Sequence, residues 1–164
     1  MSSADAAGRV LGMISALREV AERAGEAASA LREVRRCIAE HPVELGIAPK
    51  EMVHVEVRVR REYRVPAALA RLLDIPAFGV LTRASVSPDG ELRLFVSSGG
   101  FGDERVILLS LRGENSLAQV VAAALVADEE VWRALAEEAG RVAEEYRSLA
   151  ELMRRAAAAL RLSL

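Results

Sequence analysis

The sequence predicts an α+β fold, in which a four-stranded, mostly antiparallel sheet with one short helix is flanked by long N- and C-terminal amphipathic helices. At both ends of the chain, apolar residues recur at alternating steps of three and four, the spacing of a helical stripe that faces a partner helix. In the middle, short runs of alternating apolar and polar residues are separated by Pro and Gly, as in antiparallel strands. We therefore divide the chain into an N-terminal helix at 1–41, a β-rich middle at 42–115 and C-terminal helices at 116–164, which together form one cooperative domain.

The N-terminal helix is expected over residues 4–40, because its apolar residues keep the helical spacing up to this point. Pro42 then ends the helix, since proline disfavours helical geometry in the residue before it. Leu11, Met13 and Val20 widen the apolar stripe, so we expect this helix to contact more than one neighbour. The stripe itself contains Val10, Ile14, Leu17, Ala21, Ala24, Ala28 and Leu31.

The middle of the chain is predicted to form four strands. Valines alternate with polar residues over 52–60, which is typical of a half-buried strand. A short helix is expected over 67–73. The sequence Pro88-Asp89-Gly90 predicts a tight turn between two strands, because Pro presets its own backbone angle and Gly accepts a positive one. The remaining strands are expected over 78–86, 92–96 and 106–111.

Two helices are expected after the strands. The first covers 117–127, with Asn115 or Ser116 as its N-cap, and it is apolar nearly all round, so we expect it to be buried. The second covers 129–161 after Asp128 as N-cap and carries a long apolar seam. The steps of this seam average about 3.5 residues, the period that keeps a stripe facing a partner helix. The seam contains Trp132, Leu135, Ala139, Val142, Tyr146, Leu149, Met153, Ala156 and Leu160.

An apolar seam of this length requires a partner. We expect the two long helices to pair as a coiled coil or bundle, either with each other as an antiparallel hairpin or across a dimer. A homodimer is the favoured assembly, because two-fold symmetry is the commonest closure. The predicted helix interface consists of Trp132, Leu135, Val142, Tyr146, Leu149, Met153, Leu160, Ile14, Leu17 and Leu31.

Composition limits the classes of function. Apolar residues make up 52 % of the 164 residues, and the net charge of −2 gives no general attraction to nucleic acid or to anionic membranes. Cys37 is the sole cysteine, and neither a signal peptide nor a membrane-spanning stretch is visible, so we expect a cytoplasmic protein without a membrane partner. The scarcity of Asn, Gln and Cys beside many Glu and Arg is a thermophile-like composition, although a GC-rich genome predicts a similar bias.

Catalytic chemistry has little support in the sequence. His41 adjoins a helix-ending proline, and His54 lies on the polar face of a predicted strand. Neither an HExxH nor a GxSxG motif occurs, and no His and Cys stand at metal-ligand spacing. We therefore expect a protein that is not an enzyme, with no catalytic residue, no metal site and no cofactor.

A glycine-rich segment at 97–103 precedes the last predicted strand. Gly99, Gly100 and Gly102 can direct backbone N–H groups at a phosphate. Phosphate-binding glycine loops, however, normally lead into a helix N-terminus, whereas this segment leads into a strand. We interpret the segment as a hairpin connection, with Phe101 as an alternative contact point for a protein partner.

Arginines cluster on the first predicted strand and just after it. Arg58, Arg60, Arg61 and Arg64, with Tyr63 among them, could follow a phosphate backbone while the tyrosine stacks on a base. Charged side chains on an edge strand also prevent edge-to-edge aggregation, and two glutamates dilute this cluster. We favour the edge interpretation and regard nucleic acid as the alternative partner.

These observations predict a non-enzymatic, oligomeric interaction protein: a scaffold, adaptor or chaperone-like subunit that uses its long helices. The alternative is a nucleic-acid-associated protein that docks through Arg58–Arg64. Salt-dependent binding to an oligonucleotide distinguishes the two.

Overall fold

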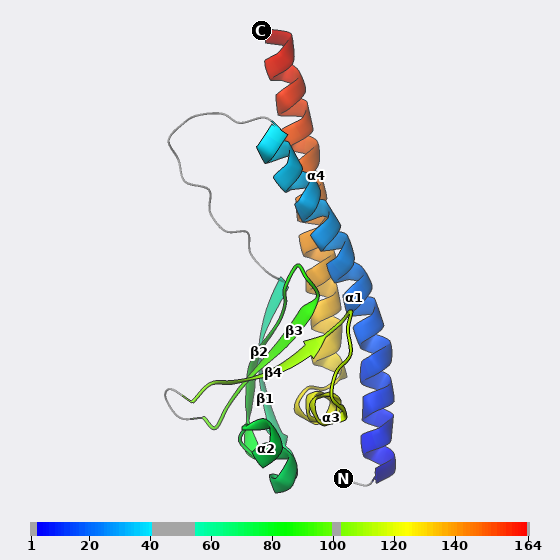
Figure 1. Cartoon of the computed structure of the whole chain (residues 1–164), viewed down its shortest axis with the longest axis vertical. Helices are drawn as coiled ribbons and strands as arrows, with labels where there is room; N and C mark the ends of the chain where they lie inside the picture. Colours follow the sequence, from blue (N-terminus) through cyan, green and yellow to red (C-terminus); the bar gives the residue numbers. More distant parts are fainter. Residues whose placement is uncertain (1–2, 41–54, 100–102, 164) are drawn as a thin grey trace.

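The computed structural model describes residues 3–40, 55–99 and 103–163, and it confirms the α+β arrangement. Two long helices and two short ones accompany a four-stranded antiparallel sheet (Figure 1). The helices are α1 (Ser3–Glu40), α2 (Ala67–Leu73), α3 (Leu117–Val126) and α4 (Glu129–Ser163). The strands are β1 (Val55–Arg64), β2 (Phe78–Val86), β3 (Glu91–Ser97) and β4 (Arg105–Ser110).

The sheet is a simple antiparallel meander in the order β1-β2-β3-β4. Each strand therefore pairs with its neighbour in the sequence, as short connections favour. The predicted turn joins β2 to β3: Gly90 adopts a φ of 86° and donates its N–H to the Ser87 carbonyl oxygen at 3.0 Å. The register of β1 against β2 shifts between Arg58 and Arg61, where β1 carries a bulge.

One face of the sheet, which we call the inner face, packs against the helices (Figure 1). Strand β3 shows the reason, because its residues alternate strictly between the two faces: Leu92, Leu94 and Val96 are fully buried, whereas Arg93 and Phe95 lie on the opposite, outer face. Leu81 of β2 and Ile107 of β4 join the same buried layer. The period-two pattern of the strands thus determines which face becomes the core.

Helix α3 closes the core beneath the inner face. Its N-cap is Ser116, one of the two predicted cap residues, which forms a reciprocal capping box with Gln119. Asn115, the other predicted cap, instead bonds through its side chain to the backbone of Ser110 at the end of β4. The prediction that this apolar helix is buried holds for its second half, which contains Ala122, Ala123, Ala124 and Val126.

The two long helices lie side by side within one chain and run in the same direction (Figure 1). Arg9, near the start of α1, donates to the Ala127 carbonyl just before α4, at 3.1 Å. Further along, Arg147 of α4 pairs with Glu26 of α1 at 2.8 Å, and Arg154 pairs with Glu33. The predicted antiparallel hairpin is therefore wrong, because the intervening sheet returns the chain to the end of the molecule at which α1 begins.

Small residues occupy the side of α4 that faces α1. Ala143, Ala150 and Ala157 are buried and lie seven residues apart, each on the same side of α4 as Arg147 and Arg154, which reach α1. The facing part of α1 is also rich in buried alanine, at Ala24, Ala27, Ala28 and Ala30. Such side chains allow two helix backbones to approach closely.

Candidate interaction surfaces

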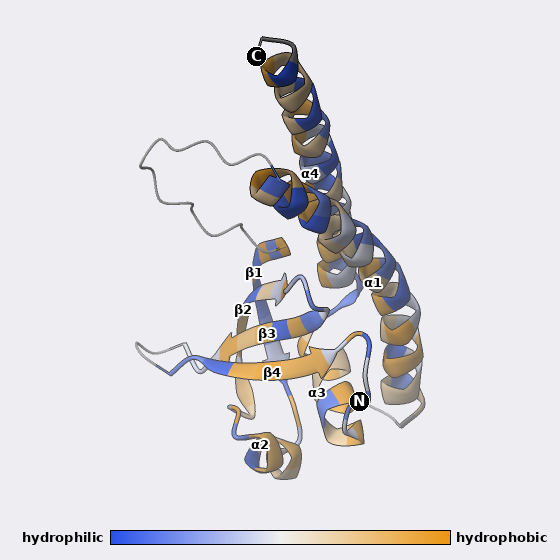
Figure 2. Cartoon of the chain, turned by 45° about the horizontal axis from the view of Figure 1, so that its top comes forward, coloured by the Kyte–Doolittle hydropathy of each residue, from blue (hydrophilic) through white to orange (hydrophobic). Residues whose placement is uncertain are grey.

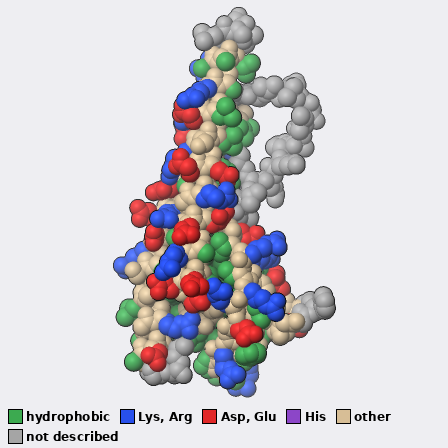
Figure 3. Space-filling view, turned by 180° about the vertical axis from the view of Figure 1, so that it is seen from behind, with side chains coloured by type: hydrophobic (Ala, Val, Ile, Leu, Met, Phe, Trp, Pro, Cys, Tyr) green, Lys and Arg blue, Asp and Glu red, His purple; other side chains and the backbone are tan. Residues whose placement is uncertain are grey.

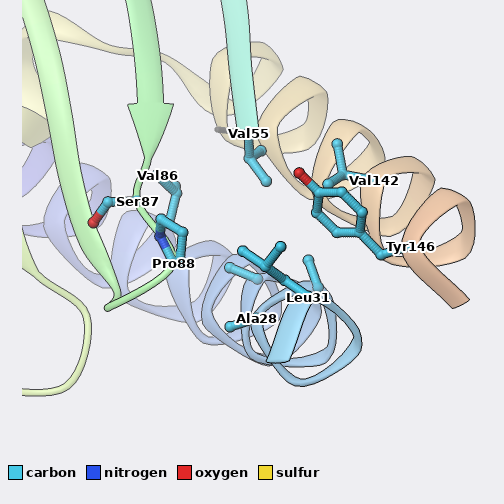
Figure 4. A pocket seen from close by; sticks show the side chains of 10 residues that line it. Ala28, Leu31, Val55, Val86, Ser87, Pro88, Val142 and Tyr146 are labelled. Atoms are coloured by element: carbon cyan, nitrogen blue, oxygen red, sulfur yellow. The ribbon is translucent and has the colours of Figure 1, made fainter. Parts of the chain in front are cut away.

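The predicted seam of α4 is covered along its first half only. Trp132, Leu135, Ala139 and Val142 are buried beneath the sheet and α1. The covering ends at a small apolar cleft where Val55 and Val86, at one end of the sheet, approach Val142 and Tyr146 of α4 (Figure 4). Leu31 of α1 is buried and lines the same cleft, so this predicted interface residue contacts the end of the sheet as well as the helix pair.

Beyond that cleft both helices continue past the sheet (Figure 1). The seam residues there lose their cover stepwise: Tyr146, Leu149 and Met153 are half-buried, whereas Ala156 and Leu160 are exposed. We call this part, α1 from residue 28 and α4 from residue 146, the projecting helix pair. Leu152 and Ile38 add exposed apolar side chains to it, at 63 % and 45 % exposure. The projecting helix pair therefore presents more apolar surface than a solvated helix needs.

The face of the helices turned away from the sheet is different in character. Figure 3 shows arginines and acidic side chains interleaved along it. Along α1 and α4, many ion pairs join side chains three or four residues apart in the sequence, such as Arg23 with Glu19 at 2.9 Å and Arg141 with Glu145 at 3.0 Å. Exposed pairs of this kind stabilise a helix by only about 0.2–0.5 kcal/mol each. This face is therefore covered by charged side chains whose pairs add little to stability.

The other two predicted interface residues lie elsewhere. Ile14 is 39 % exposed and Leu17 is half-buried, and both line a groove between the first half of α1 and the end of β4. Leu109, Leu111 and Val120 line the opposite wall of this groove. The N-terminal part of α1 thus contacts α3 and the sheet region, as its widened stripe predicted.

The arginine cluster is divided by the fold. Arg58, Arg60 and Arg64 are exposed on β1, whereas Arg61 lies after the bulge and turns to α4, where it pairs with Glu130 at 2.6 Å and with Asp128 at 3.3 Å. The structure therefore does not bring all four guanidinium groups to one surface.

Tyr63 does not accompany the exposed arginines. It is buried on the inner face, and its hydroxyl donates to the Pro76 carbonyl at 2.8 Å. Burial raises the pKa of this phenol to about 12. A tyrosine in this position cannot stack on an incoming base.

The outer face of the sheet mixes arginines, acids and aromatic rings. The Arg83 guanidinium lies 3.7 Å from the centroid of the Phe95 ring and also pairs with Glu56 and Glu104, at 3.1 and 3.0 Å. Partial burial opposes the charged form of Arg83, but its hydrogen bonds to the two carboxylates outweigh that effect and raise its pKa. The positive charge of Arg83 is therefore already paired with two carboxylates of the same chain, which disfavours binding of an external anion.

The glycine-rich segment can be followed only in part. Gly99 adopts a φ of 90°, which favours glycine. The predicted partner-contact residues Gly100, Phe101 and Gly102 lie outside the described residues. Gly99 is followed, after this gap, by the edge strand β4, so the segment connects two strands of the sheet.

Potential metal ligands and the single cysteine were located in the described part of the chain. Within 3–40, 55–99 and 103–163, no three His, Cys, Asp or Glu side chains are grouped so that they could hold a metal ion. Cys37 is buried, and His41 and His54 lie outside these residues. Across the same part of the chain, every helix is too short or too polar to cross a lipid bilayer.

Sequence reasoning missed one surface, the outer edge of β4. Val106 and Leu108 are 40 % and 41 % exposed there, although they belong to a run of four apolar residues that suggests a fully buried strand. The place of this strand in the sequence could have revealed the surface, because the last strand of a four-strand meander has only one neighbour and therefore an open edge.

Comparison with known proteins adds no relative. No protein-family model matches the chain, and neither a curated protein nor a solved structure gives a match. Function is therefore argued from the surfaces described above.

Proposed function

We propose that this chain is a non-enzymatic, homodimeric interaction protein, a scaffold, adaptor or chaperone-like subunit that binds a protein partner through its projecting helix pair. One observation carries the proposal: the seam of α4 continues past the sheet with Leu149 and Met153 half-buried and Leu160 exposed, and exposed Leu152 lies beside it. A soluble helix gains nothing from such residues unless another surface covers them. An amphipathic segment of a partner is the kind of ligand that fits a two-helix apolar face.

We also propose that α1 and α4 pair as a parallel coiled coil within one chain. Their common direction, the ion pairs from Glu26 and Glu33, and the seven-residue spacing of Ala143, Ala150 and Ala157 support this pairing. An intrachain pair leaves Leu149, Leu152 and Met153 of the projecting helix pair only partly covered, so another protein can pack on them.

The proposal is tested with an aggregating client. Reduced insulin is incubated with the protein while light scattering is recorded, and we expect the wild-type chain to suppress aggregation. Replacing Leu149 and Met153 together by Glu should remove the suppression, because it places charge on the apolar face. Leu72→Glu on α2 is the matched control, since Leu72 is 75 % exposed and lies outside the projecting helix pair. Equal suppression by all three proteins contradicts the proposed surface, and no suppression by the wild type contradicts the chaperone-like form.

The alternative function, nucleic-acid association, is supported by the exposure of Arg58, Arg60 and Arg64 on β1. It is weakened by the loss of Arg61 and Tyr63 to contacts inside the chain. Its test is given in the Discussion.

A further inference from the structure

The outer edge of β4 carries backbone groups that point away from the sheet. Ser110 shows their direction, because its N–H and C=O bond to the side chain of Asn115, at 2.6 and 2.8 Å, and not to β3. In an antiparallel strand, alternate residues direct both backbone groups to the same side. Val106 and Leu108 therefore also direct theirs outward, where no strand of the described part of the chain lies beside them.

The two edges of the sheet are protected very differently. β1, at one edge, carries Arg58, Arg60 and Arg64 among its exposed residues, the charged side chains that typically prevent strand addition. β4, at the other edge, has only apolar residues between Arg105 and Ser110 (Figure 2). Asn115 closes the edge at Ser110, so the open part is a short apolar segment with a defined end.

Apolar surface lies on both sides of this open edge. On the outer face of the sheet it consists of the half-exposed side chains Val106 and Leu108. On the inner side it is the groove between α1 and the end of β4, which Ile14, Leu17 and Leu109 line. An added strand would therefore meet apolar contacts on either face as well as the backbone groups.

We propose that the occupant of this edge is β4 of a second copy, paired antiparallel about a two-fold axis so that Val106 lies opposite Leu108 of the second copy. In this register both residues exchange backbone hydrogen bonds with their counterparts, and the two sheets become one. The axis passes beside Ile107. Because the pairing is isologous, every contact is made twice.

The charges beside the edge fit the antiparallel direction. Exposed Asp103 lies just before β4 and exposed Arg112 just after it. Antiparallel pairing in the register given above brings Asp103 of each copy close to Arg112 of the other. Parallel pairing would instead place each of these side chains beside its own counterpart, with like charges together.

This inference rests on the homodimeric part of the proposed function and supplies its interface. It is independent of the client-binding test, because β4 lies outside the projecting helix pair. A chain that suppresses aggregation as a monomer would overturn the β4 pairing and the homodimeric part of the proposed function but keep the client-binding surface. A β4-linked dimer without suppression would overturn the chaperone-like form alone.

Sedimentation equilibrium of the full chain tests the pairing first. We expect a mass twice the 17.7 kDa of one chain at micromolar concentration. Leu108→Lys should weaken self-association by about tenfold or more, because it places a charge at the open edge without touching the core. Leu72→Lys on α2 and Leu152→Lys on α4 introduce the same charge at exposed leucines away from the edge, and both should leave the mass unchanged.

Cross-linking tests the register. In a Cys37→Ala background, Val106→Cys combined with Leu108→Cys should give a covalent dimer on mild oxidation. The Cα atoms of such a hydrogen-bonded pair lie about 5.5 Å apart, within the range of a disulfide. Val106→Cys alone should remain uncross-linked, since each new thiol then lies opposite an unchanged leucine. Exchanging the charges, with Asp103→Arg and Arg112→Asp together, should restore the association that Arg112→Asp alone weakens.

Three results would overturn the inference. They are a wild-type chain that stays monomeric at 100 micromolar or so, a dimer that withstands Leu108→Lys but dissociates with Leu152→Lys, and a cross-link that forms equally well with Val106→Cys alone. A Leu108→Lys variant with an unchanged circular dichroism spectrum and a halved mass supports it.

Discussion

Arg61 and Glu130 form an ion pair, with 2.6 Å between Nη2 and Oε2, that joins β1 to the first turn of α4. Arg61 lies on the same side of β1 as Val57 and Tyr63 and reaches α4, whereas Arg58 lies on the outer face, opposite Arg83 of β2. Both members of the pair are partly exposed, so its contribution to stability is small. Its consequence is electrostatic: the cluster Arg58–Arg64 loses one of its four positive charges to the protein itself.

The exposed arginines of β1 are therefore expected to guard an edge and not to bind nucleic acid. Replacing Arg58, Arg60 and Arg64 by Ala should leave oligonucleotide affinity unchanged and undetectable in 50 millimolar salt or so. The same variant should aggregate faster, because β1 loses the charges that oppose strand addition. Fluorescence anisotropy with single- and double-stranded oligonucleotides and turbidity at 40 °C or so measure the two effects.

A matched variant separates local from global charge effects. Replacing Arg36, Arg133 and Arg155 by Ala removes the same charge from exposed helix positions and should not promote aggregation. Tight, salt-dependent binding by the wild type that the β1 variant loses would make nucleic acid the correct partner.

The order and type of the elements could be predicted from the sequence, because helices and strands space their apolar residues differently and because Pro, Gly and capping residues mark their ends. The 52–60 run predicted a strand from its valines, yet β1 continues to Arg64. The alternation itself continues, because Val55, Val57 and Tyr63 all face the core. Arg61, however, stands between them where an apolar residue would be expected, so the run of valines ended before the strand did. Local periodicity contains no information about the partner, here Glu130, that lets an arginine occupy this side of the strand.

Which elements cover the α4 seam could not be predicted from the sequence either. The apolar stripe from Trp132 to Leu160 indicates that another element covers this helix. It does not indicate which element that is or how much of the helix is covered. In the fold the sheet covers the first half, and α1 takes the neighbouring side through Ala143, Ala150 and Ala157. Alanines give a weak apolar signal, so the closest helix contact was the least visible in the pattern.

The two halves of the seam should differ in their contribution to stability. Leu135 is fully buried, so Leu135→Ala should lower the free energy of unfolding by about 2–5 kcal/mol. Leu149 is half-buried, and Leu149→Ala should cost about 1 kcal/mol. Urea denaturation followed by circular dichroism measures both. Equal costs for the two changes would mean that the projecting part of α4 is covered as fully as the rest.

Close contact between α1 and α4 should make Ala143 intolerant of larger side chains. Ala143→Leu should destabilise the protein by about 1–3 kcal/mol, because its extra methyl and methylene groups have no space between the helices. Ala159→Leu is the control, since Ala159 is exposed on the same helix and both residues favour helix about equally. If the two variants unfold at the same denaturant concentration, the alanine-lined contact is absent in solution.

Tyr63 should make stability fall at high pH. Its pKa is about 12 in the folded chain against 10.0 for an ordinary tyrosine, because burial disfavours the phenolate. The unfolded chain therefore loses this proton first. The stabilisation is fully present below pH 10 and disappears as pH rises from 10 to 12, a decrease of about 2 kcal/mol in the free energy of unfolding. Urea denaturation at a series of pH values should show this decrease.

Tyr63→Phe and Tyr146→Phe assign the decrease to one residue. Tyr63→Phe should abolish the Tyr63 part of the decrease, and at pH 8 it should already be less stable than the wild type by about 1 kcal/mol, since the Pro76 carbonyl loses its hydrogen bond. Burial, followed by the nearby Glu145, also raises the pKa of Tyr146, but this tyrosine is only half-buried, so the effect of burial is weaker. Tyr146→Phe should therefore keep most of the decrease. The opposite outcome, a flat profile in Tyr146→Phe and an unchanged one in Tyr63→Phe, would place the buried phenol on α4 and contradict the position of Tyr63 beneath the sheet.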